Sequence, residues 1–348
     1  MAVGDHSPTR PGYVEPGISK RIALLRFAMI FGIVILHTPP YIPLEQTGAG
    51  LFDFIKAFCQ HALFRSTVPV LTCVSGYLLF NAGLDQKIRV LVTKKTRTLL
   101  IPLIVWNLPL VLALYVIQSK GLMTHDFSAT LYPFDPLKMI DKTLGLFSLP
   151  VNYPLNFLRD LFILCLMAPL FGPLLRHAPW VGLAGVFVLF WFNFDGPLII
   201  RSTMPIHFYL AGMAALQRWD LTRLDRFAPI CLVLLVTICA AIVQFEITDR
   251  NWFRLISPLL IWPLSSLFLG TAVGRLCIRL SPTSFFLFLS HGPVLLAVWI
   301  LYQKLLAGVH YHVFWFVAPY LVAALCLGAR KITASYAPTV YRFALGSR

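Results

Sequence analysis

Residues 26–37 read RFAMIFGIVILH, and this stretch decides the fold. Ten uninterrupted apolar or small residues, Phe27 to Leu36, separate Arg26 from His37, which predicts a membrane-spanning helix. Eleven helical steps make about three turns, so the two side chains project from nearly the same face. Along the axis they lie roughly 16 Å apart, about half of a roughly 30 Å hydrocarbon core. Arg26 is expected near one interface and His37 near mid-depth, where an imidazole is costly and indicates a functional site.

The composition is that of a membrane protein. Of 348 residues, 58% are hydrophobic and only 12% are charged, whereas a soluble domain carries about 25% charged residues. The net charge is +15, but the Lys and Arg residues lie in short loops between apolar segments, a pattern that orients a membrane protein and indicates no nucleic-acid partner. None of the seven cysteines forms a C-x-x-C pair, and no histidines have metal-ligand spacing, so we expect no metal.

Ten apolar segments are each near the roughly 20 residues that a helical span needs. They predict an all-α integral membrane protein, a polytopic bundle of about ten transmembrane helices in the lipid bilayer. The expected spans are 22–40, 61–82, 99–117, 157–175, 180–196, 203–217, 227–245, 256–274, 284–303 and 312–329.

Basic residues recur in every connection assigned to the side of the N-terminus. The positive-inside rule then puts both termini in the cytoplasm. The expected division is a disordered cytoplasmic tail at residues 1–20, a single transmembrane domain at 21–330 and a cytoplasmic C-terminal tail at 331–348. The first of these segments is polar and contains Pro and Gly, without the pattern of a signal peptide.

Five short elements occur in an order that is typical of one protein family. The first is the spacing of ten residues between Arg26 and His37. The others are VSGYLL at 74–79, KKTR at 94–97, PLNFLRDL at 154–161 and SFFLFLSH at 284–291. Together they resemble the membrane acyltransferase family 3. The chain departs from the family at Asn156, where Trp is frequent, and at Lys94, which replaces the first Arg of a basic pair and loses its bidentate geometry.

Members of that family are multi-span proteins that move acyl groups onto extracytoplasmic polysaccharides and related glycans. The resemblance implies an acyl-CoA-dependent O-acyltransferase of the bacterial cytoplasmic (inner) membrane. Acyl-CoA would be the donor, a polysaccharide or lipid-linked oligosaccharide the acceptor, and the exopolysaccharide assembly machinery a partner.

Two observations bear on the acyl group. The run from Arg21 to Pro40 resembles the branch of the family that succinylates bacterial exopolysaccharides such as succinoglycan. Arg65 and Arg201 lie in or beside apolar segments that offer few acids, so we expect the transferred group to carry its own carboxylate. Succinyl-CoA is therefore the favoured donor and acetyl-CoA the alternative.

His37 and Arg26 are the predicted catalytic residues, and each has a simpler interpretation. His37 could be a core histidine hydrogen-bonded to another span, or it could be the general base for a sugar hydroxyl or a transient acyl carrier. The ordered motifs favour catalysis. Arg26 could be a flanking charge, or it could bind the acyl donor, because its planar fork suits phosphate and carboxylate. The distance between them is comparable to an extended pantetheine arm, so acyl-CoA is expected to enter from the cytoplasm.

Lys94 and Arg97 are the other predicted donor-binding residues. They lie one helical turn apart and can hold one anion, which suggests a CoA phosphate. The alternative is that they only set the topology. No Gly-rich phosphate loop accompanies them, so nucleotide hydrolysis has little support.

Ser75, Arg159 and Asp160 are predicted to support the site. Ser75 precedes Gly76, and this pair either permits close helix packing, the favoured interpretation, or lets Ser75 donate a hydrogen bond to a thioester oxygen. Arg159 and Asp160 are either flanking charges or, if they face inward, orient the acceptor or the acyl group.

His291 is the fourth supporting residue. The nearby Pro293 frees a backbone carbonyl and predicts a kink. We expect His291 nearer the cytoplasmic side than His37, with structural and functional roles equally open. His207 is a further histidine within an apolar segment.

Two other classes of protein remain as alternatives. A transporter or flippase for a polysaccharide or small solute would also have many spans and polar residues at mid-depth. A non-catalytic membrane subunit of an export complex is the second. The absence of an obvious internal repeat and the ordered motifs favour the enzyme.

Overall fold

The computed structural model describes residues 12–122, 129–192, 198–306 and 308–346. All regular structure in these ranges is helical, which confirms the all-α prediction for them. The α-helices are α1 (Pro16–Leu36), α2 (Leu51–Ala57), α3 (Thr67–Asn81), α4 (Ile88–Lys95), α5 (Ile101–Ser119), α6 (Pro136–Leu144), α7 (Asn156–His177), α8 (Pro179–Trp191), α9 (Met204–Leu216), α10 (Ala228–Gln244), α11 (Asn251–Phe268), α12 (Ala272–Leu280), α13 (Ser284–Leu305), α14 (Tyr311–Tyr336) and α15 (Pro338–Ala344). Short 3-10 and π segments join several of them, among them η2 (Phe58–Ala62), η3 (Leu63–Ser66), η5 (Thr96–Leu100) and η6 (Tyr153–Leu155).

Within the described ranges, six helical stretches are long and apolar enough to cross a membrane. They are Leu51–Asn81, Ile88–Ser119, Tyr153–His177, Asp225–Gln244, Ala272–Leu305 and Tyr311–Tyr336. α8 and α9 are apolar but shorter. Each of the ten predicted segments overlaps a helix, so the chain has the helices of a multi-pass membrane protein. The total of about ten spans and the cytoplasmic termini stay predictions.

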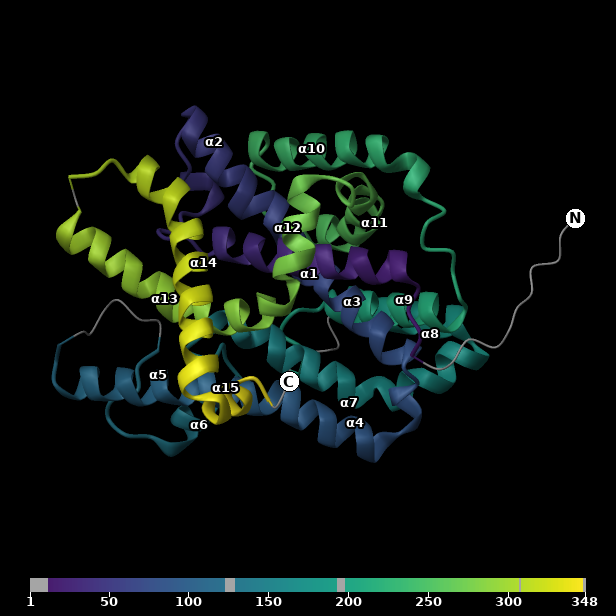
Figure 1. Cartoon of the computed structure of the whole chain (residues 1–348), viewed down its shortest axis with the longest axis horizontal. Helices are drawn as coiled ribbons and strands as arrows, with labels where there is room; N and C mark the ends of the chain where they lie inside the picture. The colour runs from purple at the N-terminus through teal and green to yellow at the C-terminus, as the bar shows by residue number, and fades with distance from the viewer. Residues whose placement is uncertain (1–11, 123–128, 193–197, 307, 347–348) are drawn as a thin grey trace, which may run out of the picture.

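α1 runs through the middle of the helical bundle. In Figure 1 it crosses the centre of the view, with α10 along the upper side and α4 along the lower side. It packs against α3, α12, α13 and α14. The helix ends at Leu36, four residues before the predicted boundary, because the Pro39-Pro40 pair cannot continue it. His37 is consequently the C-terminal cap residue of α1 and not a residue inside the helix.

The core joins α3 and α9 closely. A Cβ atom at Gly76 would lie 2.6 Å from the carbonyl oxygen of Phe208, so only glycine allows the two backbones to approach this far. The largest cluster of buried apolar side chains draws on α1, α3, α7, α9 and α13. This confirms that the Ser75-Gly76 pair serves close helix packing.

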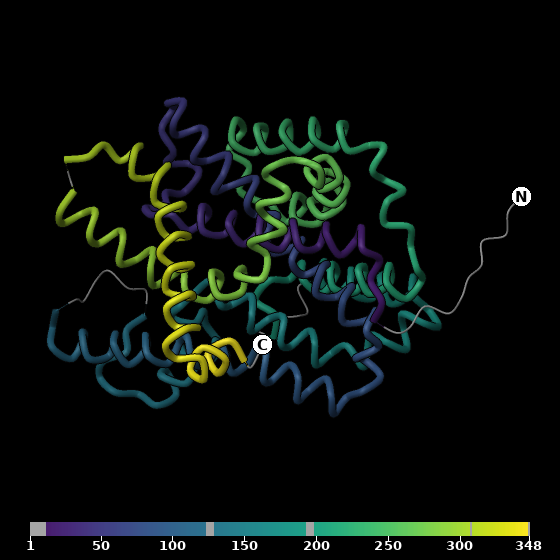
Figure 2. Tube along the Cα trace, in the orientation of Figure 1, coloured from purple at the N-terminus to yellow at the C-terminus, as the bar shows by residue number. Residues whose placement is uncertain are grey.

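Both ends of the chain contain more regular structure than the expected tails. Residues 16–20 belong to α1, and Ile18 is buried, whereas residues 1–11 lie outside the described part. α14 extends to Tyr336 and α15 follows it. Figure 2 shows this yellow C-terminal segment against the blue trace of α5, where the indole of Trp106 donates a hydrogen bond of 3.1 Å to the carbonyl oxygen of Ala344.

Candidate active site

A pair of histidines from the two ends of the sequence forms the centre of the site. Nδ1 of His37 lies 3.1 Å from Nε2 of His291, which belongs to α13. The two rings are nearly parallel, with an interplanar angle of 7°. His291 is fully buried and His37 is partly exposed. His37 at the end of α1 thus meets the second turn of α13, and the prediction that His291 lies nearer the cytoplasmic side than His37 stays a prediction.

The acceptors around the pair determine its neutral tautomers. Nδ1 of His291 lies 2.7 Å from the carbonyl oxygen of Phe288, and a carbonyl only accepts, so this nitrogen carries the proton. Nε2 of neutral His291 is then an acceptor, and Nδ1 of His37 must donate to it. In this state Nε2 of His37 keeps a free lone pair. That nitrogen is the atom that a general base requires.

Hydrogen bonds from side chains to backbone carbonyl oxygens hold the chain around His37. The side-chain amide of Gln60, in η2, donates to the carbonyl oxygen of Ile35 in the last turn of α1 at 3.3 Å and to that of Thr38, just beyond the helix, at 2.7 Å. Further donors to the following segment are Lys56 to Pro40, His61 to Ile42 and Tyr311 to Pro39. His37 is thus presented on a fixed helix end.

The second histidine lies two residues before Pro293, which is inside the unbroken helix α13. Pro293 has no N–H for the carbonyl oxygen of Leu289, four residues earlier. The side-chain amide of Asn152 donates to that oxygen at 3.3 Å, which satisfies the carbonyl that the proline frees. The adjacent residue, Tyr153, contacts the ring of His37 edge-on with centroids 4.6 Å apart. The connection before α7 therefore supports both histidines.

A cavity of about 410 Å³ opens beside the middle of α1, where Arg26 lies with ten helical residues before it and ten after it. We call it the basic cavity, because Arg26, Lys94 and Lys95 line it among mainly apolar side chains. Ser75 is also in its wall, with its hydroxyl donating to the carbonyl oxygen of Leu71 at 2.8 Å. The structure thus brings together two predicted donor-binding residues that lie in different helices, and adds Lys95.

Arg97 lies in an adjoining cavity of about 520 Å³, with Arg89, Thr93 and the backbone near Gly346. Lys94 and Thr98 line both cavities, so the two are neighbours along one side of α4 and η5. The first cavity also reaches Phe288, whose carbonyl oxygen holds His291. Phe288 therefore touches both the basic cavity and His291, while the lining of the cavity includes neither His37 nor His291.

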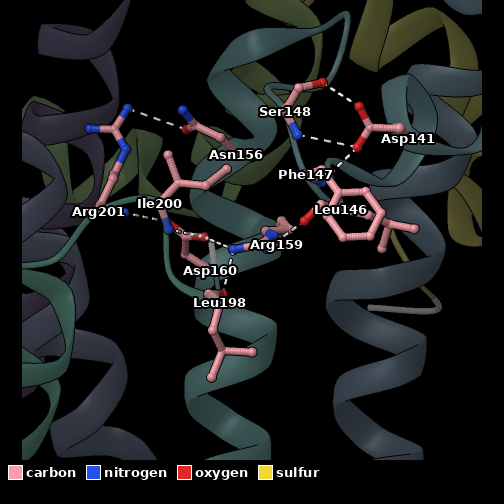
Figure 3. Close-up of polar contacts among 10 residues, drawn as sticks. All are labelled: Asp141, Leu146, Phe147, Ser148, Asn156, Arg159, Asp160, Leu198, Ile200 and Arg201. Atoms are coloured by element: carbon pink, nitrogen blue, oxygen red, sulfur yellow. Dashed lines mark hydrogen bonds and ion pairs between the residues drawn. The ribbon is translucent and has the colours of Figure 1, made fainter. Parts of the chain in front are cut away.

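Arg159 and Asp160 face inward, as one of the two interpretations predicted. Figure 3 shows them at the start of α7, bonded to each other at 2.7 Å between Nη1 and Oδ1. Arg159 also donates to the carbonyl oxygens of Leu198 and Leu146, and Asp160 accepts from the backbone N–H groups of Ile200 and Arg201. Their observed contacts tie two connections to α7, one of which carries Arg201.

The other connection follows α6, and Asp141 in that helix closes it (Figure 3). Its carboxylate accepts from the backbone N–H groups of Phe147 and Ser148 and from the Ser148 hydroxyl. Partial burial raises the pKa of Asp141, but these hydrogen bonds outweigh it and hold the pKa below its usual value. The carboxylate form therefore stabilises this connection.

Four arginines gather beside His37, and the sequence indicated only two of them. Arg65 and Arg201 lie near enough to His37 for their charges to act on its ring. Arg250 and Arg254, around the start of α11, are in turn within reach of the charges of Arg65 and Arg201. Their four-residue spacing at the start of an apolar segment was the available signal, but it is identical to that of ordinary flanking charges. His207 is buried next to this group, with its Nε2 atom 3.4 Å from the carbonyl oxygen of Leu255, the neighbour of Arg254.

Comparison with known proteins establishes the class to which this fold and site belong. A family model described as an acyltransferase domain matches residues 19–329, so the chain belongs to the membrane acyltransferase family 3, and the predicted resemblance is confirmed. The chain is also similar to the succinoglycan biosynthesis protein ExoH of Rhizobium meliloti (strain 1021). The two are 30% identical over 355 residues, which cover 96% of this chain and 94% of that protein. No solved structure matches the chain. The roles of individual residues stay predictions.

Proposed function

We propose that this protein is an O-acyltransferase of the bacterial inner membrane that moves an acyl group from acyl-CoA to a hydroxyl group of an extracytoplasmic polysaccharide or of its lipid-linked precursor. The observation that carries the proposal is the free lone pair on Nε2 of His37, fixed by the contact with His291. The family match supports the reaction class, and the name of the similar succinoglycan protein supports a polysaccharide acceptor. Succinyl is the favoured acyl group and acetyl the alternative.

The basic cavity is the proposed binding site for the donor. Lys94 and Arg97 are exposed and bind the phosphates of CoA, while Arg26 holds the donor deeper in the cavity. Arg26 and His37 are separated along α1 by roughly 16 Å, a length that an extended pantetheine arm covers. The cavity reaches Phe288, whose carbonyl oxygen holds His291, so we place the thioester at this inner end of the cavity. In this arrangement Arg26 faces the cytoplasm.

The proposed reaction uses His37 as a general base. Its Nε2 accepts the proton of the acceptor hydroxyl while the hydroxyl oxygen attacks the thioester carbon. The carbon–sulfur bond then breaks, and the proton passes from His37 to the CoA thiolate. His291 positions His37 and fixes the proton on its Nδ1. A route through an acyl group on His37 uses the same lone pair.

Purified protein in lipid nanodiscs, supplied with acyl-CoA and an oligosaccharide, tests the proposal. We expect release of one CoA thiol for each ester formed, and loss of both products in His37→Ala and Arg26→Ala. Solute flux in liposomes without ester formation would instead indicate a transporter or flippase. Absence of thiol release from wild-type protein with any acyl-CoA would overturn the enzymatic assignment.

A further inference from the structure

Arg65, Arg201, Arg250 and Arg254, here called the arginine cluster, come from three separate parts of the chain. Arg65 is in η3, Arg201 is in the connection before α9, and the other two are at the start of α11. Each of the four is half-buried. Charges brought this close repel one another, and partial burial strengthens the repulsion. A folded protein keeps such a group where an anion compensates it.

Neutral acceptors hold the arginine cluster in place. Arg65 donates to the carbonyl oxygen of Gln60 at 2.9 Å and to the hydroxyl of Tyr41 at 3.0 Å. The remaining acceptors are the side chain of Asn156 for Arg201, Nδ1 of His61 for Arg250 and the side chain of Asn251 for Arg254. Each guanidinium has five N–H donors, so most donors of the cluster are unused by these bonds.

The positive charge of the arginine cluster is only partly balanced by carboxylates, because Asp160 attracts Arg201 and Asp249 attracts Arg254 while four guanidinium groups are present. Among the described residues, no ion pair includes any of the four arginines. The side chain of Asp160 already pairs with Arg159, and it reaches Arg201 through the backbone N–H group. The buried Nε atoms of Arg201 and Arg250 have no hydrogen-bond partner. Buried donors without partners cost free energy, and an anion with two oxygen atoms would satisfy them.

We propose that the arginine cluster is the subsite for the distal carboxylate of the transferred acyl group, and that it selects a dicarboxylic acyl donor such as succinyl-CoA. This inference rests on the proposed acyltransferase function. The distal carboxylate of a succinyl thioester is only two methylene groups from the reacting carbonyl carbon, so its subsite must adjoin the base. Arg65 meets this condition because it bonds the backbone of Gln60, whose side chain bonds the carbonyl oxygen of Thr38, next to His37. Arg201 meets it because it bonds Asn156, three residues after Tyr153, whose ring contacts that of His37. Arg250 and Arg254 complete the positive wall behind them.

The test compares two donors of similar length that differ in the carboxylate. Succinyl-CoA and butyryl-CoA are given to purified protein with a neutral oligosaccharide acceptor, and kcat/KM is measured from ester formation. A site built around a charged group rejects an analogue without it, so we expect a preference for succinyl-CoA of at least about 100-fold. Arg201→Gln and Arg254→Gln should each lower this ratio by about tenfold, and the double variant should lower it further.

Controls separate loss of the subsite from loss of the fold. Arg201→Lys keeps a charge without the planar fork and should restore part of the ratio. Arg223→Gln removes an exposed arginine in the connection before α10 and should leave the ratio unchanged. Size-exclusion chromatography of each variant shows whether the protein is folded, and because the readout is a ratio of two donors, a general loss of active protein does not alter it.

The outcomes distinguish this inference from the function on which it rests. Wild-type protein that transfers both acyl groups equally, or variants that lose both in the same proportion, would overturn the subsite and leave the acyltransferase intact. A dependence on the arginines that appears only with a carboxylate-bearing acceptor, whichever donor is used, would assign the subsite to the glycan and overturn it as well. Wild-type protein that transfers no acyl group would refute the function itself.

Discussion

The two basic regions of the molecule hold their cations differently. In the basic cavity and the cavity beside it, Lys94 and Arg97 are exposed side chains that line open space. In the arginine cluster the side chains are half-buried and bonded to fixed neutral acceptors. Two regions with the same sign of charge can therefore serve different functions. Exposed, adaptable cations suit large phosphate groups, whereas a fixed, partly dehydrated set suits one small carboxylate beside the base.

Removal of His37, the proposed base between the two regions, should have the largest effect on activity. His37→Ala deletes the lone pair that accepts the hydroxyl proton, and we expect kcat to fall by about 10² to 10⁴-fold. The KM for acyl-CoA should change little, because both basic regions remain. Steady-state thiol release measures both constants. His177→Ala, an exposed histidine at the end of α7, is the matched control. An unchanged kcat in His37→Ala would contradict the role of this residue.

His291 tests whether the pair works as a unit. In His291→Ala the proton on Nδ1 of His37 is no longer fixed, so kcat should fall by about 10- to 100-fold. His291→Gln offers an amide oxygen as acceptor and should recover part of the rate. Damage to packing alone predicts no such recovery, because the shape of Gln differs from that of His as well. Equal kcat in the Ala and Gln variants would show that His291 does not orient His37.

The cations of the basic cavity should affect affinity more than rate. Lys94→Ala and Arg97→Ala remove charge-assisted bonds to phosphate at exposed positions, and each should raise the KM for acyl-CoA by about tenfold. The increase should shrink at high salt, where exposed charges are screened. Arg279→Ala, an exposed arginine in α12, serves as control. A fall in kcat at constant KM would contradict donor binding by these residues and would remove the contrast with the arginine cluster.

The contact between α3 and α9 offers a test of packing. In Gly76→Ala the new methyl group meets the backbone of Phe208, so α3 and α9 must separate, at a cost of about 1–3 kcal/mol. Thermal unfolding in detergent, followed by tryptophan fluorescence, measures the loss of stability. Gly328→Ala, in α14, meets no atom within 4 Å and should not destabilise the protein. Equal unfolding temperatures for the two variants would contradict the close approach of α3 and α9.

Protonation of Asp141 should have the smallest effect, a loss of local stability in the connection that Arg159 links to α7. Because its folded pKa is below the usual value, its stabilising contribution is present above about pH 3.8 and is lost as the pH falls below that value. Hydrogen exchange at the amides of Phe147 and Ser148 should accelerate on acidification, after correction for intrinsic rates. In Asp141→Asn this additional dependence should disappear. The same acid response in both proteins would exclude the carboxylate as its cause.

Sequence analysis predicted the parts of the site that lie on single segments. The helical spacing of Arg26 and His37 is a local property, and the carbonyl freed by Pro293 follows from the missing N–H of proline. The contact between His37 and His291 joins residues 254 positions apart, and no periodicity in one sequence encodes it. The end of α1 was misplaced because the predicted span was extended from Leu36 through Pro39 and Pro40, which cannot continue a helix.

The arginine cluster was only half predicted for a related reason. Arg65 and Arg201 were noticeable because they lie in or beside apolar segments with few acids. Arg250 and Arg254 occupy the place where flanking charges normally occur, so only the packing of α11 beside η3 distinguishes them. The shorter helices α8 and α9 likewise show why the number of spans does not follow from hydropathy alone.

The most direct test of the central claim is a labelling experiment with bromoacetyl-CoA, whose reactive carbon lies next to the thioester. If the basic cavity delivers the thioester to His37, Nε2 of that residue displaces bromide and retains the alkyl group. Mass spectrometry of the digested protein should find the modification on His37, and excess unlabelled CoA should prevent it. Modification confined to other residues, such as the cysteines Cys73 and Cys165, with His37 untouched, would contradict the account.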